Sequence, residues 1–103
     1  MCHGASGRGE GWLSEHLKNR PPSLTRLRKN NGGVFPFEQV YEVIDGRKEV
    51  RIHGPRDMPV WGFAYRREAE KSYNPYFDQY LVDEGVVRAR ILALVEYISQ
   101  LQE

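Results

Sequence analysis

The stretch that decides the fold is residues 87–101, VRARILALVEYISQL, near the end of the chain. Its apolar side chains recur at steps of three and four residues, at Val87, Ile91, Leu94, Val95, Ile98 and Leu101. This spacing matches the turn of an α-helix and puts the apolar side chains on one face. The stretch therefore predicts a long amphipathic helix.

Ahead of this helix, short helical segments alternate with loops rich in glycine and proline. Residues 37–45 follow Pro36, which suits a helix start, and Gly46 closes the segment. Shorter helical turns are expected over 13–18 and 23–29. Evidence for strands is thin, so we expect a mainly α fold.

The tyrosines and phenylalanine ahead of the last helix, at Tyr73, Tyr76, Phe77 and Tyr80, are expected in a loop that covers the core.

Length and composition limit the possible functions. The 103 residues are enough for one domain, residues 1–103. Fifteen basic residues against 14 acidic ones give no broad field for nucleic acid or a membrane surface. No apolar run reaches the roughly 18–20 residues of a transmembrane helix. Cys2 is the single cysteine, which excludes an internal disulfide, and a small core without one often needs a cofactor.

Two short motifs carry possible cofactor chemistry. The sequence MCHG at 1–4 matches the end of C-x-x-C-H, the attachment signature of c-type haem, in which the histidine binds the iron. Met58 lies in RDMPVWG, between Pro55 and Pro59, which stiffen the loop. A methionine opposite a histidine on haem iron raises its reduction potential. Taken singly, the first motif is more often incidental and the second more often a core methionine.

The order and spacing of the motifs resemble the class I c-type cytochromes, in particular small bacterial mono-haem domains. The matching segments cover nearly the whole chain: CHG at 2–4, ASGRGEG at 5–11, PPSLT at 21–25, NGGVFPFEQVYEVIDGR at 31–47, HGPRDMPVWG at 53–62 and ILALVEYISQL at 91–101. The resemblance implies a cytochrome c-like fold of short helices and long loops around haem c. It also implies an electron carrier rather than an enzyme, in the periplasm, with redox proteins as partners.

The resemblance also implies roles for particular residues. His3 corresponds to the proximal iron ligand, Met58 to the distal iron ligand, and Cys2 to the second cysteine that attaches the haem. Pro22 corresponds to the proline whose backbone carbonyl accepts the ring N–H of the proximal histidine. His53 is a possible rival to Met58, but we assign it no ligand role.

Two further residues would surround the haem. Leu24 would pack on the ring, and Trp61 would lie beside it and donate its indole N–H to a propionate.

The chain departs from the family pattern at its start. The first cysteine of C-x-x-C-H and the preceding helix are absent, and we expect a chain begun at an internal methionine, with a signal peptide lost by the same cut. As written, the chain can make one thioether bond, so we expect it to be largely haem-free when made in a cytoplasm. Without the first helix, the face of the last helix that carries Leu94 and Tyr97 would be uncovered and would favour self-association.

Other interpretations stay open. The chain could be a cytochrome domain cut from a larger oxidase or dehydrogenase subunit, or a haem-free helical interaction domain. Arg20, Arg26, Arg28 and Lys29 form a basic cluster that suits a docking surface or a solvated face better than a nucleic-acid site. The glycine run at 4–11 suggests a phosphate-binding loop only superficially, because no strand precedes it and no Gly-Lys-Ser/Thr follows.

Overall fold

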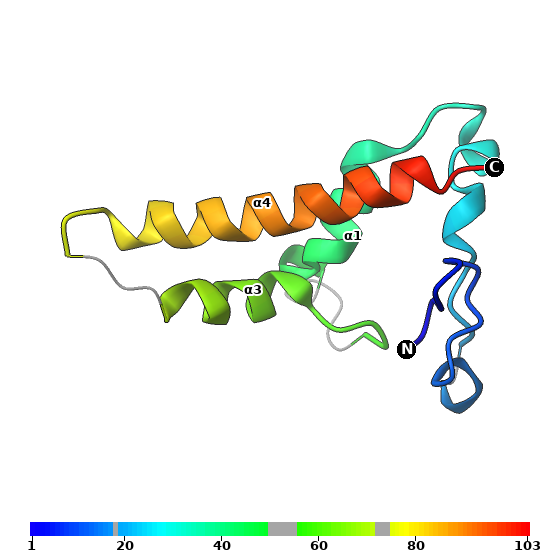
Figure 1. Cartoon of the computed structure of the whole chain (residues 1–103), viewed down its shortest axis with the longest axis horizontal. Helices are drawn as coiled ribbons and strands as arrows, with labels where there is room; N and C mark the ends of the chain where they lie inside the picture. Colours follow the sequence, from blue (N-terminus) through cyan, green and yellow to red (C-terminus); the bar gives the residue numbers. More distant parts are fainter. Residues whose placement is uncertain (18, 50–55, 72–74) are drawn as a thin grey trace. The chain divides into compact units, whose positions relative to one another are not determined.

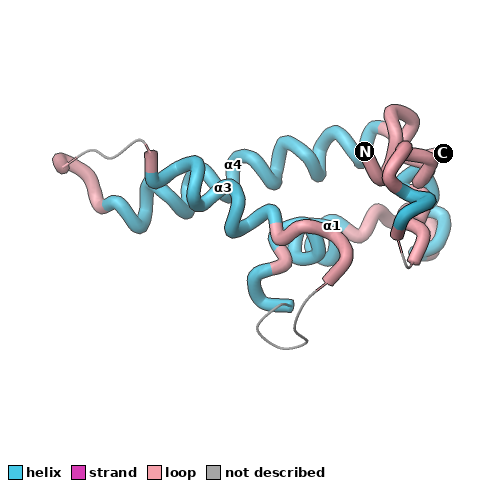
Figure 2. The backbone as a smooth tube through the Cα atoms, turned by 90° about the horizontal axis from the view of Figure 1, so that it is seen from below, coloured by secondary structure: helices cyan, strands magenta, loops and turns pink. Residues whose placement is uncertain are grey.

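A computed structural model describes the whole chain except residues 18, 50–55 and 72–74. The described residues are mainly helical and contain no strand, which confirms the predicted mainly α class (Figures 1 and 2). Among the elements whose bounds lie within the described residues, three short 3-10 turns come first and three α-helices follow. The turns are Ser14–His16, Leu24–Arg26 and Lys29–Asn31, and the helices are α1 at Phe37–Asp45, α3 at Trp61–Glu70 and α4 at Gln79–Gln100.

The chain divides into two compact units. Residues 1–37 and 95–103 form one, which we call the loop unit, and residues 38–94 form the other, the helix unit. The helix unit contains most of α1, all of α3 and the first part of α4. The loop unit contains the 3-10 turns and the end of α4. The single domain expected over 1–103 stays a prediction.

Helix α1 has the bounds that the sequence predicts. Val40 and Ile44 are one turn apart, and both are buried. The helix ends before Gly46, whose φ of +70° is a left-handed conformation that glycine adopts without strain. Local sequence signals therefore determine both ends of this helix.

Helices α3 and α4 form an antiparallel hairpin within the helix unit (Figure 1). Ala69 of α3 and Val87 and Ile91 of α4 are buried, and Ile91 is completely inaccessible to solvent. At the start of α3, a Cβ atom on Gly62 would overlap the carboxylate of Asp45, so this glycine allows α3 to approach the end of α1. The buried positions of α4 follow the predicted period.

Two expectations for this region are wrong. Trp61 and Gly62, expected in a loop, are the first residues of α3. Tyr80, expected in a loop, lies in α4, which begins at Gln79. Tyr73 lies outside the described residues.

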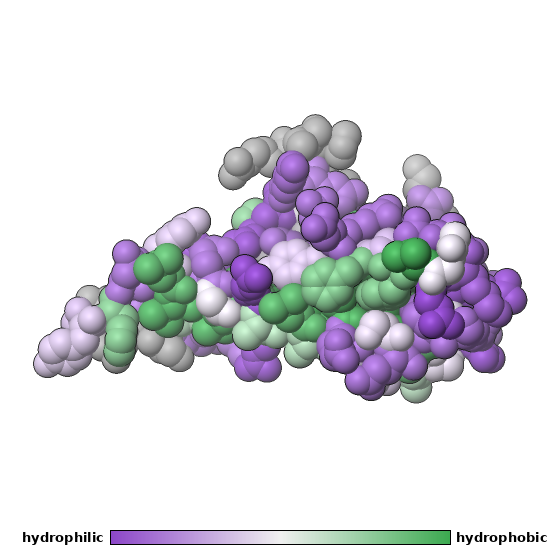
Figure 3. All heavy atoms as spheres, turned by 90° about the horizontal axis from the view of Figure 1, so that it is seen from above, coloured by the Kyte–Doolittle hydropathy of each residue, from purple (hydrophilic) through white to green (hydrophobic). Residues whose placement is uncertain are grey.

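The aromatic side chains before and at the start of α4 do not cover a core in the described structure. Tyr76 is 90% exposed, and Phe77 and Tyr80 are also largely exposed. On the face drawn in Figure 3, hydrophobic side chains (green) are visible among the hydrophilic ones (purple). Helix α4 begins before its periodic apolar pattern starts. This first part is helical because ion pairs hold polar residues such as Asp83 there.

The loop unit gains its order mainly from short turns and backbone hydrogen bonds. The expected turns over 13–18 and 23–29 contain 3-10 turns at Ser14–His16 and Leu24–Arg26, and a third 3-10 turn, Lys29–Asn31, begins at the end of the second range. The hydroxyl of Ser23 caps the Leu24–Arg26 turn by accepting the Thr25 N–H. Val95 and Ile98 of α4 are buried in this unit, whereas Tyr97 is 55% exposed. None of the described helices has both the length and the apolar content to cross a membrane.

Candidate functional site

The backbone of Cys2 and His3 is held by the glycine-spaced loop that follows it. The Gly11 N–H donates to the Cys2 carbonyl at 2.9 Å, and the Gly9 N–H donates to the His3 carbonyl at 2.8 Å. A Cβ atom on Gly11 would overlap the backbone of residues 1 and 2. Only glycine therefore allows the loop to fold back so closely along this segment.

Gly9 also allows this loop to lie close to the two prolines. Its φ is +85°, and an added Cβ atom would overlap the carbonyl oxygen of Pro21. Neither the conformation nor the space suits any other residue. The glycine run thus positions the Cys2-His3 backbone against the Pro21-Pro22 segment.

The His3 ring lies half-buried in this setting. Its Nδ1 is buried and has no hydrogen-bond partner among the described residues. Burial lowers the pKa of His3 below its ordinary value of 6.5, and the nearby Pro22 carbonyl opposes this by raising the pKa. Burial is the larger of the two effects, so the pKa stays below its ordinary value. The imidazole is therefore neutral at pH 7, the form that can ligate a metal.

Cys2 and Leu24 complete the candidate residues of the loop unit. Cys2 is a free, partly buried thiol. Leu24 is fixed at both backbone groups: its N–H donates to the Gly7 carbonyl at 2.6 Å, and its carbonyl accepts from Gln102 Nε2 at 2.6 Å. The loop unit therefore contains four of the predicted site residues, Cys2, His3, Pro22 and Leu24.

Met58 belongs to the helix unit, where Arg56 anchors its backbone. Arg56 Nε donates to the Met58 carbonyl at 3.0 Å, and Arg56 Nη1 pairs with Glu49 at 3.0 Å. The Arg56 side chain is 11% exposed and passes over Gly46, where a Cβ atom would lie 2.5 Å from Nη1. Pro55 and His53 lie outside the described residues. An arginine that the sequence did not point to thus restrains the Met58 backbone, and the stiffening by Pro55 and Pro59 stays a prediction.

Trp61 is also in the helix unit, at the first position of α3. Its ring stacks on Tyr65 with centroids 6.0 Å apart and planes inclined by 24°. One face of the indole is therefore covered by a neighbour one helical turn along.

An ion-pair cluster that the sequence did not predict supports the helix unit. Arg47 pairs with Asp45 at 2.7 Å and with Glu84 at 2.9 Å, and Arg66 pairs with Glu84 at 2.7 Å and with Asp83 at 3.2 Å. Hydrogen bonds from Arg47 lower the pKa of Glu84 below its ordinary value. Asp83 is almost completely buried. The cluster links α1, the following segment, α3 and α4.

The two predicted iron ligands fall in different units, His3 in the loop unit and Met58 in the helix unit. Among the described residues, no group of three or more His, Cys, Asp and Glu side chains could hold a metal ion. A haem iron takes only two axial ligands from the protein, so that finding does not bear on a haem site.

No protein-family model, no curated protein and no solved structure matches this chain. The case for any function therefore rests on its own residues.

Proposed function

We propose that this chain is a c-type cytochrome domain that carries electrons through a covalently attached haem. The observation that carries the proposal is His3, which directly follows the thiol of Cys2 and has a neutral, half-buried ring beside the Pro22 carbonyl. A Cys-His pair occurs by chance in many chains. Here the glycine loop, in which positions 9 and 11 leave no room for a Cβ atom, holds this pair beside the Pro21-Pro22 segment.

The loop-unit residues fit a haem. The buried Nδ1 of His3 has no partner among the described residues, and we propose that its N–H donates to the nearby Pro22 carbonyl when the haem is bound. Such a bond fixes the tautomer in which Nε2 keeps its lone pair for a metal. Cys2 supplies the thiol for one thioether bond, and Leu24 supplies an apolar contact. When bound, the haem supplies a one-electron iron couple.

The helix-unit residues have complementary chemistry. The Met58 sulfur is a soft ligand whose presence raises the potential of haem iron. Arg56 restrains the Met58 backbone, which reduces the entropy lost when the side chain binds a ligand. Trp61 has an indole N–H that suits a propionate oxygen.

Electron transfer through a covalently attached haem also implies the protein's partners and its location. A carrier of this kind docks briefly on redox partner proteins through a small interface. We place it in the periplasm because covalent attachment requires machinery outside the cytoplasm. Its architecture would then be the cytochrome c-like fold.

The test is covalent haem attachment in an extended chain. Two residues, Cys-Ala, are added ahead of Met1 to complete C-x-x-C-H, an export signal is placed before them, and the attachment machinery is co-produced. We expect one haem per chain, measured as the pyridine haemochrome after acid-acetone extraction. The 103-residue chain made in the cytoplasm should show no strong Soret band.

Matched variants identify the residues responsible. Cys2→Ser in the extended chain should reduce covalent haem sharply, and His3→Gln should abolish the low-spin spectrum. His16→Gln, which changes an exposed histidine, should alter neither. A folded extended chain that acquires no haem, or one in which the His3 and His16 variants behave alike, would contradict the proposal.

A further inference from the structure

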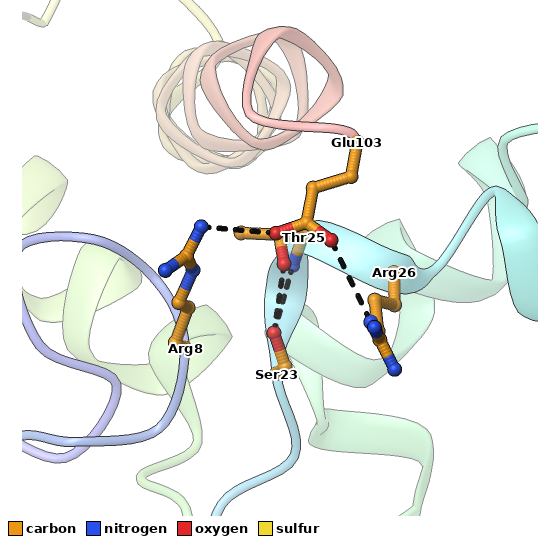
Figure 4. A pocket seen from close by; sticks show the side chains of 5 residues that line it. All are labelled: Arg8, Ser23, Thr25, Arg26 and Glu103. Atoms are coloured by element: carbon orange, nitrogen blue, oxygen red, sulfur yellow. Dashed lines mark hydrogen bonds and ion pairs between the residues drawn. The ribbon is translucent and has the colours of Figure 1, made fainter.

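A pocket of about 390 Å³ in the loop unit is lined by Arg8, Ser23, Thr25, Arg26 and Glu103 (Figure 4). Two guanidinium groups meet one carboxylate there. Arg8 Nη2 lies 3.1 Å from Glu103 Oε1, and Arg26 Nε lies 3.6 Å from Glu103 Oε2. The pocket therefore presents cationic donors to an anionic group.

Two hydroxyl groups add neutral donors at the same place. Ser23 Oγ and Thr25 Oγ1 are 2.9 Å apart, and Ser23 Oγ also accepts the Thr25 N–H at 3.3 Å. Thr25 is buried, and its carbonyl accepts the Glu103 N–H at 2.9 Å. The hydroxyls are thus held in fixed positions beside the arginines.

The carboxylate of Glu103 is only a partial match for these donors. The two guanidinium groups of Arg8 and Arg26 share the single carboxylate of the Glu103 side chain, so its one charge is divided between them. The Arg8 and Arg26 side chains are 58% and 64% exposed, and pairs of such exposed groups are weak. A better anion can therefore displace Glu103 without disturbing a buried core.

Burial tends to raise the pKa of Glu103, but Arg8, the Thr25 hydroxyl and Arg26 together lower it. The carboxylate is therefore ionised at neutral pH and competes with any incoming anion.

We propose that this pocket binds a tetrahedral dianion of the phosphate class, and that the Glu103 side chain occupies the pocket when the dianion is absent. The forked donors of arginine match phosphate oxygens, and hydroxyl groups donate to the oxygens that remain. A dianion also balances both guanidinium charges, which the single carboxylate does not. The site is independent of the haem proposal, since its residues are none of those assigned to haem.

The test is calorimetric titration of the 103-residue chain with inorganic phosphate at pH 7.5, at ionic strength held constant with chloride. Glu103→Gln keeps the shape of the side chain and removes its charge, and we expect it to tighten phosphate binding about threefold to fivefold, the effect of losing one exposed ion pair. Arg26→Gln in the Glu103→Gln background should weaken binding by at least the same factor.

Controls separate this site from general charge effects. Arg90→Gln removes an exposed arginine that pairs with Glu68 in the helix unit, and it should leave phosphate affinity unchanged. Acetate, a planar monoanion, should bind at least several-fold more weakly than phosphate. Far-UV circular dichroism confirms that each variant keeps its helices. Equal phosphate affinity in the wild type and Glu103→Gln, equal losses for Arg26 and Arg90, or equal binding of acetate would each overturn the proposal.

Discussion

In the helix unit, the apolar residues of helices pack together and partly buried ion pairs join the helices, whereas in the loop unit glycines and backbone hydrogen bonds hold most of the chain. Val87 and Ile91 are buried on one face of α4, and Arg47 and Glu84 link segments 37 residues apart. In the loop unit, Gly9 and Gly11 let the chain fold tightly around Cys2 and His3. The helix unit thus has a core of its own, while the loop unit presents a partly buried histidine, which is where we propose that haem binds.

The largest effect should come from the core of the helix unit. Ile91→Ala removes a completely buried side chain, and we expect it to lower the free energy of unfolding by about 3 kcal/mol. Leu81→Ala, at a 67% exposed position of the same helix, should change it by less than about 0.5 kcal/mol. Urea unfolding followed by circular dichroism measures both. Similar losses for the two variants would mean that α4 does not bury the Ile91 face.

The ion-pair cluster should give the next largest effect. Glu84→Gln removes the charge that Arg47 and Arg66 share, and we expect a loss of about 2 kcal/mol, less than for a fully buried pair because the Glu84 side chain is 27% exposed. The matched control is Glu68→Gln, which breaks an exposed pair with Arg90 and should cost less than about 0.5 kcal/mol. Equal losses of unfolding free energy for Glu84→Gln and Glu68→Gln would show that the cluster does not stabilise the helix unit.

In the loop unit, two glycines with nearly the same backbone conformation allow a sharp comparison. Gly9 has φ +85° and faces the Pro21 carbonyl, whereas Gly33 has φ +88° and no atom within 4 Å of an added Cβ. Gly33→Ala should cost about 1 kcal/mol from backbone strain alone. Gly9→Ala should cost roughly 1 kcal/mol more, because it adds a clash, and should shift the NMR signals of the His3 ring. Unchanged His3 signals would show that the glycine loop does not position this histidine.

The smallest expected effect is the pH dependence of stability, which differs between the two units. The pKa of His3 is lowered on folding, so the unfolded state binds its proton first, and the contribution of His3 to stability is lost as pH falls through 6.5. The pKa of Glu84 is also lowered, so its contribution is lost only as pH falls below its ordinary value of 4.5. NMR titration of the two side chains should show these separate windows. His3→Gln should abolish the change in stability near pH 6.5. If that change persists in the variant, it belongs to another group.

The sequence predicted those parts of the fold that local patterns determine. The bounds of α1 and the buried positions Val87 and Ile91 followed from spacing and from Gly46. Helix α3 was missed because its buried residues, Gly62 and Ala69, are small and leave little apolar signal. The start of α4 was missed for a similar reason, since ion pairs rather than apolar residues hold it.

For the candidate site, the sequence identified residue types but not their surroundings. The pairing of Arg56 with Glu49 and of Arg47 with Glu84 joins residues that are 7 and 37 positions apart, and no periodic pattern reports such contacts. A possible signal for the first was Gly46, because a glycine after a helix end can leave room for a large side chain.

The most direct test of the central claim is the ferric spin state of the haem-loaded, extended chain, measured by electron paramagnetic resonance. The account predicts a low-spin signal, since His3 and the Met58 sulfur would bind the iron from opposite faces. Met58→Ala should convert the signal to high-spin and lower the reduction potential, while Val60→Ala, two residues away, should leave both unchanged. A low-spin signal and a potential that survive the loss of Met58 would contradict the assignment of this residue, and survival after the loss of His3 would contradict the account itself.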